Sequence, residues 1–393
     1  MLVLEYKVKG SKSQYKAIEE SIKTTQFIRN KCLRYWMDCS KEDKINRFAL
    51  NKYSTELRNE FKFVKDLNSM AVQSAAERAW FAISRFYQNC KSKKTGKRGF
   101  PRFQKDNRST EYKTSGWKLH STKRRIIFTD KKDIGELKLL GSWDIHTFSV
   151  KAIKRVRLVR RPDGYYCQFS VDINSSKQLE PTGNQIGLDV GLEHFYSDSN
   201  GEHLENPKFL RKAETKIKRS QRRIYKHKKG SNKRRKSRKI YARKHLKVSR
   251  QRTEFAKRIA LTLVSSNDVI AYEDLNVRNM VKNHCLAKSI NDVAWKLFRQ
   301  WLEYFSQKYG RLAIAVKPHY TSQICSNCGV KVKKTLSQRT HNCKCGCILQ
   351  RDVNAAINIL ERARGGHPQS NAQGVVTSTL LGESLVEQVT TMN

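Results

Sequence analysis

Three acidic residues stand out because each lies beside a short apolar segment or a helix start, far apart in the chain. Asp189 lies in IGLDVG (186–191), Glu273 in VIAYED (269–274) and Asp352 in RDVNAA (351–356). Singly, they could end a strand, form an ion pair and cap a helix. Together they indicate a metal site, because carboxylates suit Mg²⁺, and two ions can clamp the attacking and leaving oxygens of a phosphodiester displacement.

A second set of residues suited to metal binding is a group of cysteines near the C-terminus. Five of the ten cysteines fall between positions 325 and 347, which is typical of a metal site in a reducing compartment and not of disulfides. Two thiolates three residues apart, followed by glycine, can face one ion. The group therefore predicts one structural Zn²⁺, for which the preferred ligands are Cys325, Cys328, Cys343 and Cys345.

The second half of this cysteine group departs from the usual spacing and leaves alternatives open. Cys343 with Cys345 is preferred because Cys345 and Gly346 repeat the arrangement of Cys328 and Gly329. A pair of Cys345 with Cys347, or a contribution from His341, fits the sequence as well. With four thiolates the ion has no open position, so it is expected to stabilise structure and not to cut.

The charge of the chain indicates the partner. Lys and Arg number 80 against 35 Asp and Glu, a formal net charge of +45, so the partner is expected to be a polyanion. Residues 211–258 contain 23 Lys or Arg and only two acids, with interleaved apolar residues and a break near 229–231. This pattern predicts a basic helical hairpin along phosphates, with Arg222, Arg223, Lys226, Arg234, Arg235 and Arg238 as contacts. No long apolar stretch supports a membrane role.

The elements around the acids predict how they are positioned. Apolar alternation predicts strands at 186–190, 194–197, 268–273 and 312–316, a turn at 200–201, a long helical stretch after it, and a helix near 291–308. This order is that of a ribonuclease H-like fold. In that fold the first strand, the fourth strand and the last helix each carry one of the three acids.

The N-terminal half predicts a strand at 1–9 and a hairpin of strands at 152–161 and 164–173, which we expect to close one small β-barrel. Between them, apolar stripes predict helices over 13–39 and 68–90. Most residues of these stripes are expected to be core, including Phe27, Ile28 and Ile83.

Several motifs resemble the TnpB family of transposon-encoded RNA-guided nucleases. They are GFPRF (99–103), GLDVGL (187–192), YEDLNV (272–277), TSQICSNCG (321–329), LSQRTH (336–341) and RDVNAAINI (351–359). The resemblance implies a RuvC-type site in which Asp189, Glu273 and Asp352 bind two Mg²⁺ and cut double-stranded target DNA opened by a guide RNA. Gln350 is a departure, because relatives commonly have an acid there.

The resemblance also implies a domain organisation. It comprises a wedge-type β-barrel with an oligonucleotide-binding-like fold (1–10 and 96–180), an inserted helical recognition domain (11–95), a RuvC nuclease domain (181–320 and 349–363) and a zinc-ribbon insert (321–348). A flexible tail (364–393) follows. Recognition of a motif flanking the target is expected to involve Tyr53, Gln73 and Arg78. A cytoplasmic, nucleoid-associated protein bound to one RNA is expected, and the number of copies is left open.

Four alternatives are kept. Compact type V CRISPR effector nucleases share the catalytic half. A guided repressor would bind without cutting, although all three acids are present here. A DNA transposase would place its acids in the order Asp, Asp, Glu, whereas this chain has Asp, Glu, Asp. A non-enzymatic zinc-ribbon RNA-binding protein is the last alternative, and bound RNA with guided cleavage would exclude it.

Overall fold

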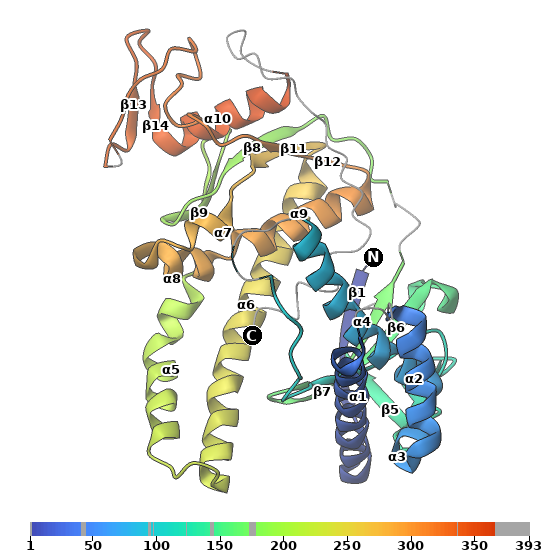
Figure 1. Cartoon of the computed structure of the whole chain (residues 1–393). Helices are drawn as coiled ribbons and strands as arrows, with labels where there is room; N and C mark the ends of the chain where they lie inside the picture. Colours follow the sequence, from blue (N-terminus) through green and yellow to red (C-terminus); the bar gives the residue numbers. More distant parts are fainter. Residues whose placement is uncertain are drawn as a thin grey trace. The chain divides into compact units, whose positions relative to one another are not determined.

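The polypeptide folds into two units that meet in the sequence near residue 173 (Figure 1). The computed structural model describes residues 2–40, 45–92, 96, 98–122, 124–141, 145–172, 178–335 and 337–365. We call its parts unit 1 (2–172) and unit 2 (178–365). The expected tail lies outside the described residues, apart from its first two positions.

Unit 1 contains a seven-stranded sheet in the order β2-β6-β7-β1-β5-β4-β3. Its strands are β1 (Leu2–Lys9), β2 (Ser109–Tyr112), β3 (Trp117–Leu119), β4 (Arg125–Phe128), β5 (Gly135–Leu140), β6 (Ile153–Arg161) and β7 (Gly164–Val171). The hairpin of β6 and β7 has the turn expected from the sequence, with Arg161 paired to Gly164. The edge strands β2 and β3 are consecutive in the chain and only residues 113–116 separate them, so the sheet must curl strongly.

Four helices of unit 1 lie between β1 and β2 in the sequence. They are α1 (Lys12–Asp38), α2 (Arg47–Glu60), the single-turn α3 (Lys62–Lys65) and α4 (Ser69–Lys91). α1 begins with a capping box, in which Ser11 accepts from the backbone of Gln14 and the Gln14 side chain accepts from the backbone of Ser11. Ile28 and Ile83 are buried as expected, but Phe27 is only half-buried. α2 was not among the expected helices.

Unit 2 contains a five-stranded sheet in the order β10-β9-β8-β11-β12. The strands are β8 (Gln185–Asp189), β9 (His194–Asp198), β10 (His203–Glu205), β11 (Val269–Glu273) and β12 (Leu312–Val316). β8, β9 and β10 are antiparallel neighbours, whereas β11 runs parallel to both β8 and β12. The strands expected at 186–190, 194–197, 268–273 and 312–316 are therefore confirmed within one residue at each end.

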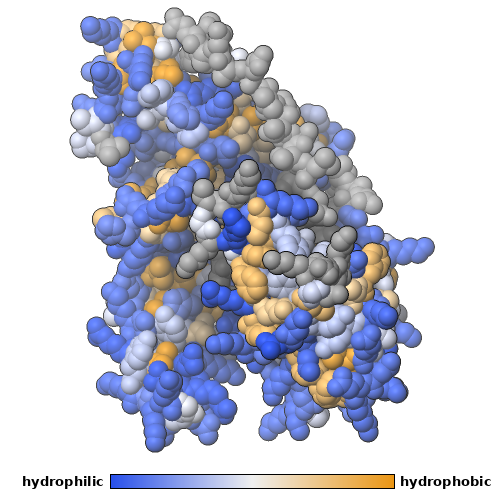
Figure 2. Space-filling model, in the orientation of Figure 1, coloured by the Kyte–Doolittle hydropathy of each residue, from blue (hydrophilic) through white to orange (hydrophobic). Residues whose placement is uncertain are grey.

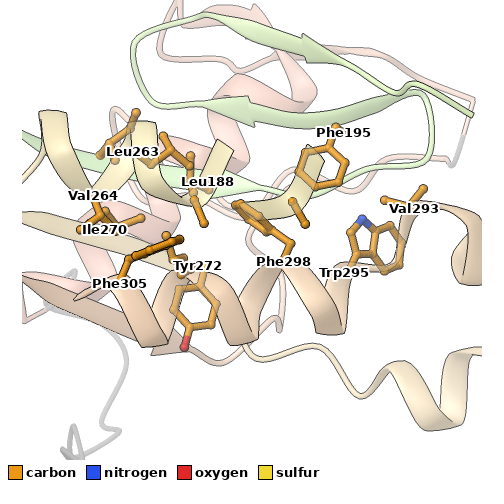
Figure 3. Packing of buried hydrophobic residues seen from close by; sticks show 14 of the residues in the cluster. Leu188, Phe195, Leu263, Val264, Ile270, Tyr272, Val293, Trp295, Phe298 and Phe305 are labelled. Atoms are coloured by element: carbon orange, nitrogen blue, oxygen red, sulfur yellow. The ribbon is translucent and has the colours of Figure 1, made fainter. Parts of the chain in front are cut away.

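Helices cover this sheet on two faces. α6 (Asn232–Ser266), α8 (His284–Val293) and α9 (Trp295–Tyr309) form one large apolar core with alternate residues of the strands, among them Leu188 and Tyr272 (Figure 3). α10 (Arg351–Ala363) packs on the other face against Ala271 and Val316. Because side chains alternate along a strand, residues of opposite parity face α10.

The helix expected near 291–308 is two helices. α8 ends at Val293, and the capping residue Ala294 has a left-handed backbone (φ 60°, ψ 44°) while its N–H still donates to the carbonyl of Ile290. α9 starts directly afterwards. The apolar periodicity is nearly continuous across this break, so the sequence pattern predicted a single helix. The break itself is one residue, Ala294, with a left-handed backbone.

The basic segment forms two helices, α5 (Phe209–Tyr225) and α6, which lie side by side as a hairpin (Figure 1). The break falls at residues 226–231, and Ser231 caps α6 by accepting from the backbone of Arg234. Figure 2 shows a mostly hydrophilic surface over this hairpin. The described helices include none that is both long enough and apolar enough to cross a bilayer.

Candidate active site and cysteine cluster

The three acids lie on the α10 face of the unit 2 sheet. Asp189 and Glu273 are the last residues of the parallel strands β8 and β11, in which Leu188 pairs with Tyr272. Leu188 and Tyr272 belong to the core on the opposite face, so the acids that follow them point towards α10. Asp352 is in the first turn of α10. The structure therefore brings the three predicted residues to one end of one face.

The close approach of α10 depends on a glycine. A Cβ at Gly187 would lie 2.1 Å from the carbonyl oxygen of Ala356 and 2.9 Å from Cβ of Leu360. Any other residue would push α10 away from β8. Gly187 therefore sets the separation between the strand that carries Asp189 and the helix that carries Asp352.

The electrostatics of the acids reflect their proximity. Burial raises the pKa of Asp189 well above its ordinary value, and repulsion from Glu273 and Asp352 raises it further against the attraction of Arg351. Burial also raises the pKa of Glu273, although a hydrogen bond from Thr321 and the charge of Arg362 oppose that shift. A divalent cation would relieve this repulsion, and the donor set consists of carboxylates, which suits Mg²⁺. Among the described residues, the carboxylate oxygens of the three acids do not all lie within 4.8 Å of one another. In this they differ from the sulfurs of the cysteine cluster, which do.

The segment that enters the cysteine cluster contacts both Glu273 and α10. Thr321 Oγ1 donates to Glu273 Oε1 at 2.6 Å. The fully buried amide of Asn354 accepts from the backbone of Ser326 (3.0 Å) and donates to the carbonyl of Ile324 (2.8 Å). One turn later, Asn358 donates to the same carbonyl and to that of Thr321. α10 therefore supports the acid site and the cysteine cluster at once.

Four thiols form the cysteine cluster, and they are those of Cys325, Cys328, Cys343 and Cys345, all within 4.8 Å of one another. Sγ of Cys325 is 3.7 Å from Sγ of Cys345, and Sγ of Cys328 is 3.5 Å from Sγ of Cys343. The backbone N–H of Cys347 is the main cause that lowers the pKa of Cys345, to about 6. The low pKa of Cys345 and the spacing of the four sulfurs fit Zn²⁺.

Two similar turns present these thiols. In the first, Gly329 has a φ of 73° and its N–H donates to Cys325; in the second, Gly346 has a φ of 86° and its N–H donates to Cys343. The second turn connects the antiparallel strands β13 (Thr340–Asn342) and β14 (Ile348–Gln350), and an isolated bridge between Ile324 and Lys331 flanks the first turn. The match between the turns is the one expected from the repeated cysteine and glycine.

A second possible ligand set overlaps the first. Cys325, His341 and Cys347 also lie within 4.8 Å of one another. His341 is fully buried, its Nδ1 contacts Nζ of Lys334, and its Nε2 has no hydrogen-bond partner among the described residues. The alternative ligands left open by the sequence, Cys347 and His341, therefore lie beside Cys325 of the four-thiol cluster.

The predicted nucleic-acid contacts differ in their exposure. Five of the six candidates on the basic hairpin are exposed, namely Arg222, Arg223, Lys226, Arg235 and Arg238. Arg234 is half-buried, because its Nη1 donates to the carbonyl of His227 at 3.0 Å and its guanidinium lies over the ring of Tyr225.

The three candidates of unit 1 are half-buried. Tyr53 stacks on Tyr35 with ring centroids 4.3 Å apart, and Gln73 lies on α4. Arg78 donates to Ser109 through Nη1, and burial lowers its pKa to about 10. Arg78 therefore has an internal partner and is a weaker candidate for DNA contact than the sequence indicated.

Thr321, Asn354 and Asn358 were not singled out from the sequence, although they lie in quoted motifs. Two features of the sequence could have indicated them. Thr321 lies four residues before the first cysteine of the cluster. The two asparagines follow Asp352 at a spacing of i and i+4, which puts both on one face of the helix.

Comparisons with known proteins agree with these features. A family model described as "Probable transposase" matches residues 168–284, and one described as "Cas12f1-like, TNB domain" matches residues 295–359. A "Putative RNA-guided DNA endonuclease" of Streptomyces pristinaespiralis is 38% identical over 177 residues, 44% of each chain. The match thus spans less than half of that relative.

A longer match is to "Putative RNA-guided DNA endonuclease InsQ" of Escherichia coli (strain K12), which is 28% identical over 319 residues, 77% of this chain and 76% of that one. A "TnpB-like protein" of Acanthamoeba polyphaga mimivirus is 31% identical over 124 residues, 30% of this chain and 24% of that one. Among solved structures, the Cas12f1 chain of a complex with guide RNA and target DNA has a TM-score of 0.54 at 15% identity, over 89% of this chain and 83% of that one, which shows a shared fold. These matches cover the segments that carry the quoted motifs, so the chain is similar to proteins of the TnpB family, as its motifs indicated.

Proposed function

We propose that the protein is an RNA-guided DNA endonuclease that cuts target DNA next to a short flanking motif, with Asp189, Glu273 and Asp352 as its catalytic residues. The observation that carries this proposal is the convergence of three acids on one face of the unit 2 sheet, where burial and mutual repulsion raise the pKa of Asp189. The names of the relatives from Streptomyces and Escherichia coli support the same activity.

The proposal includes a ribonuclease H-like, RuvC-type nuclease domain. The strand order β10-β9-β8-β11-β12, with three antiparallel strands followed by two parallel ones, supports it. The domain comprises residues 181–320 and 349–363, and residues 321–348 form the zinc-ribbon insert. In unit 1, we assign the curled sheet to a wedge-type barrel (1–10 and 96–180) and helices α1 to α4 to a recognition domain (11–95).

The three carboxylates would hold two Mg²⁺ ions. What the ions supply when bound is activation of water and charge stabilisation at the leaving 3′ oxygen. The residues of the chain position the acids: Thr321 fixes one oxygen of Glu273, and Gly187 lets α10 bring Asp352 close to Asp189. Arg351 and Arg362 place positive charge near the acids, which favours their ionised forms.

The four thiolates of the cysteine cluster would hold one Zn²⁺ with no position left for a substrate, so its role is structural. The exposed arginines of α5 and α6 would contact the phosphates of the guide RNA or its heteroduplex, while base pairing by the RNA reads the sequence. Since the substrate is DNA, we place the protein at the nucleoid in the cytoplasm.

The experiment that tests this function starts from protein purified out of cells that express its native locus. Any co-purified RNA is sequenced, and the complex is incubated with Mg²⁺ and a plasmid library that matches the variable end of the RNA beside randomised flanks. Cleavage that depends on the guide and on one flanking motif is the expected result.

Each other outcome selects an alternative. A guide encoded in a repeat array indicates a compact type V effector. Bound RNA without cleavage indicates a repressor or another RNA-binding protein. Strand joining without RNA indicates a transposase, the class named by the matching family model.

A further inference from the structure

An aromatic and basic groove runs along the exposed side of α1 in unit 1. One part, of about 450 Å³, is lined by Phe27, Lys31, Arg34 and Phe103 among others. An adjoining part, of about 330 Å³, is lined by Phe63 and Lys132 among others, and the two parts share Phe27 and Lys23. Phe63 and Phe103 are 40% and 43% exposed, so part of each side chain is open to solvent.

The groove is a built feature and not a chance gathering of side chains. Gln26 and Asn30 of α1 bind the backbone of residues 104–107, which fixes the segment that carries Phe103 along the helix. Across the groove, the rings of Phe27 and Phe63 meet edge to face with centroids 5.1 Å apart. The GFPRF motif thus has a position on this surface that the nuclease site does not explain.

The cations of the groove are available to a partner. Lys31 lies 5.7 Å from the ring centroid of Phe27, and Lys132 lies 6.0 Å from that of Phe63. In the part of the chain that the structure describes, no salt bridge is formed by Lys23, Lys31 or Lys132, although the charge of Lys132 acts on the nearby carboxyl of Asp130. Arg34 forms a surface pair with Asp38, and Glu20 is an acid that lines the second part of the groove. The balance of charge favours an anionic partner.

We infer that this groove binds a single-stranded stretch of nucleic acid, with unpaired bases stacked on Phe63 and Phe103 and phosphates beside Lys23, Lys31 and Lys132. Stacking on aromatic rings flanked by cations is how proteins hold single strands without reading their sequence. A duplex buries its base faces and could not use the rings. The cores of protein interfaces are depleted in lysine, so the three lysines argue against a protein partner.

The inference deepens the proposed function, because it rests on the protein handling nucleic acid, but it does not require cleavage. Its test therefore omits Mg²⁺. Single strands of thymine or uracil nucleotides that contain 5-iodouracil are cross-linked by light to the full-length protein, and the linked peptides are identified by mass spectrometry. Cross-links at Phe27, Phe63 or Phe103 are expected.

Affinity measurements give a second readout. The Phe63→Ala and Phe103→Ala double variant should bind single strands about tenfold more weakly, while its affinity for duplex DNA changes little. Lys23→Ala should reduce the slope of log affinity against log salt concentration by about one, as expected when one phosphate contact is lost. The matched controls are Phe48→Ala, an aromatic residue that is 80% exposed on α2, and Lys16→Ala, an exposed lysine of α1 that does not line the groove.

Two arms identify the source of the strand. In one, the protein carries its guide RNA and the labelled strand is DNA; in the other, the protein is assembled on RNA that contains 5-iodouridine. Groove cross-links in the first arm assign the groove to a displaced DNA strand, and in the second arm to the RNA itself. Cross-links confined to other segments would overturn the inference. So would a double variant that binds normally but shifts from dimer to monomer in light scattering, since that result would make the groove a contact between copies.

Discussion

The hydroxyl of Thr321 donates a 2.6 Å hydrogen bond to Oε1 of Glu273, although the two residues are 48 positions apart in the chain. Thr321 begins the segment that leads into the cysteine cluster, and its carbonyl accepts from Asn358 of α10. The acid at the end of β11 is therefore oriented by the same segment that enters the cysteine cluster. Changes in that cluster should reach the acid site through this contact.

Replacement of Thr321 by Val keeps the shape of the side chain and removes the hydrogen bond. Because groups that orient metal ligands typically contribute 10- to 100-fold to affinity or activity, we expect guided cleavage to need roughly tenfold more Mg²⁺ for its half-maximal rate. The measurement is a magnesium titration of cleavage. Thr321→Ser, which keeps the hydroxyl, is the control, and equal Mg²⁺ requirements for both variants would count against an orienting role.

Asp189→Ala should abolish guided cleavage and leave guided binding nearly intact. It should not destabilise the protein in magnesium-free buffer, because it removes a carboxyl whose pKa is raised by burial and by repulsion from its neighbours. Added Mg²⁺ should raise the melting temperature of the wild-type protein and not that of the variant, since only a bound ligand stabilises the fold. Asp274→Asn, which removes an exposed carboxylate next to Glu273, is the matched control. Equal loss of cleavage and binding would refute the division of roles.

Each of the four clustered thiols should be required for zinc. Cys328→Ser and Cys345→Ser should lower the zinc content of the purified protein and its melting temperature, whereas Cys347→Ser should retain zinc. Metal analysis checks this directly. The reverse result, zinc lost with Cys347→Ser and kept with Cys345→Ser, would show that the overlapping set of Cys325, His341 and Cys347 supplies ligands.

Gly187→Ala should destabilise unit 2 by about 3 kcal/mol, since the new Cβ meets a backbone oxygen at 2.1 Å that no rotamer change can move. Chemical denaturation followed by a probe in unit 2 measures the effect. Gly191→Ala, whose Cβ would lie 3.1 Å from the carbonyl of His194, should cost clearly less. Similar losses for the two variants would mean that α10 does not depend on this close approach.

The stability of unit 1 should depend on pH through Glu111, which is 2% exposed and contacts Arg155 and Arg157 of β6. Burial alone would raise the pKa of Glu111, but the two arginines outweigh burial and lower it. Because folding lowers the pKa of Glu111, the stability that its charge contributes is complete above the pKa of this carboxyl in the unfolded chain. This stability is lost as the pH falls through the lower pKa of the folded protein.

Glu111→Gln should accordingly reduce the unfolding free energy by about 2 kcal/mol near neutral pH, and the difference from wild type should shrink in acid. Thermal unfolding between neutral and acidic pH measures it. Glu136→Gln, which removes a surface pair with Arg125, should have little effect at any pH. A difference that persists unchanged in acid would contradict the assigned role of the charge.

The sequence predicted the elements that carry the acids because their signals are local. Short apolar runs that end in Asp189 and Glu273 predict strands, and the cysteine spacing predicts a shared ion. The pairing of β8 with β11 was not readable from the residues, since register depends on contacts between segments about 80 residues apart. The pairing of these two strands could be expected only because the order of the elements resembles that of a known fold.

Other features were missed for identifiable physical reasons. α2 has only three buried residues, Leu50, Ser54 and Leu57, so its apolar stripe is weak, although Asn46 is a clear N-cap. Phe27 falls on the apolar stripe of α1 yet lines a groove, because a stripe can extend past the edge of the core. Arg78 was expected to be exposed, but its partner Ser109 lies on a strand 31 positions away.

Different residues of the segment RDVNAAINI (351–359) have different roles. Asp352 faces the acid site, Asn354 and Asn358 hold the loop of the cysteine cluster, and Ala356 meets the glycine of β8. A descendant of this protein that lost Asp352 would still need the remaining residues to fold. The motif would then persist in lineages that no longer cut DNA, so finding it in a genome identifies the architecture, and only the acid at its second position speaks for cleavage.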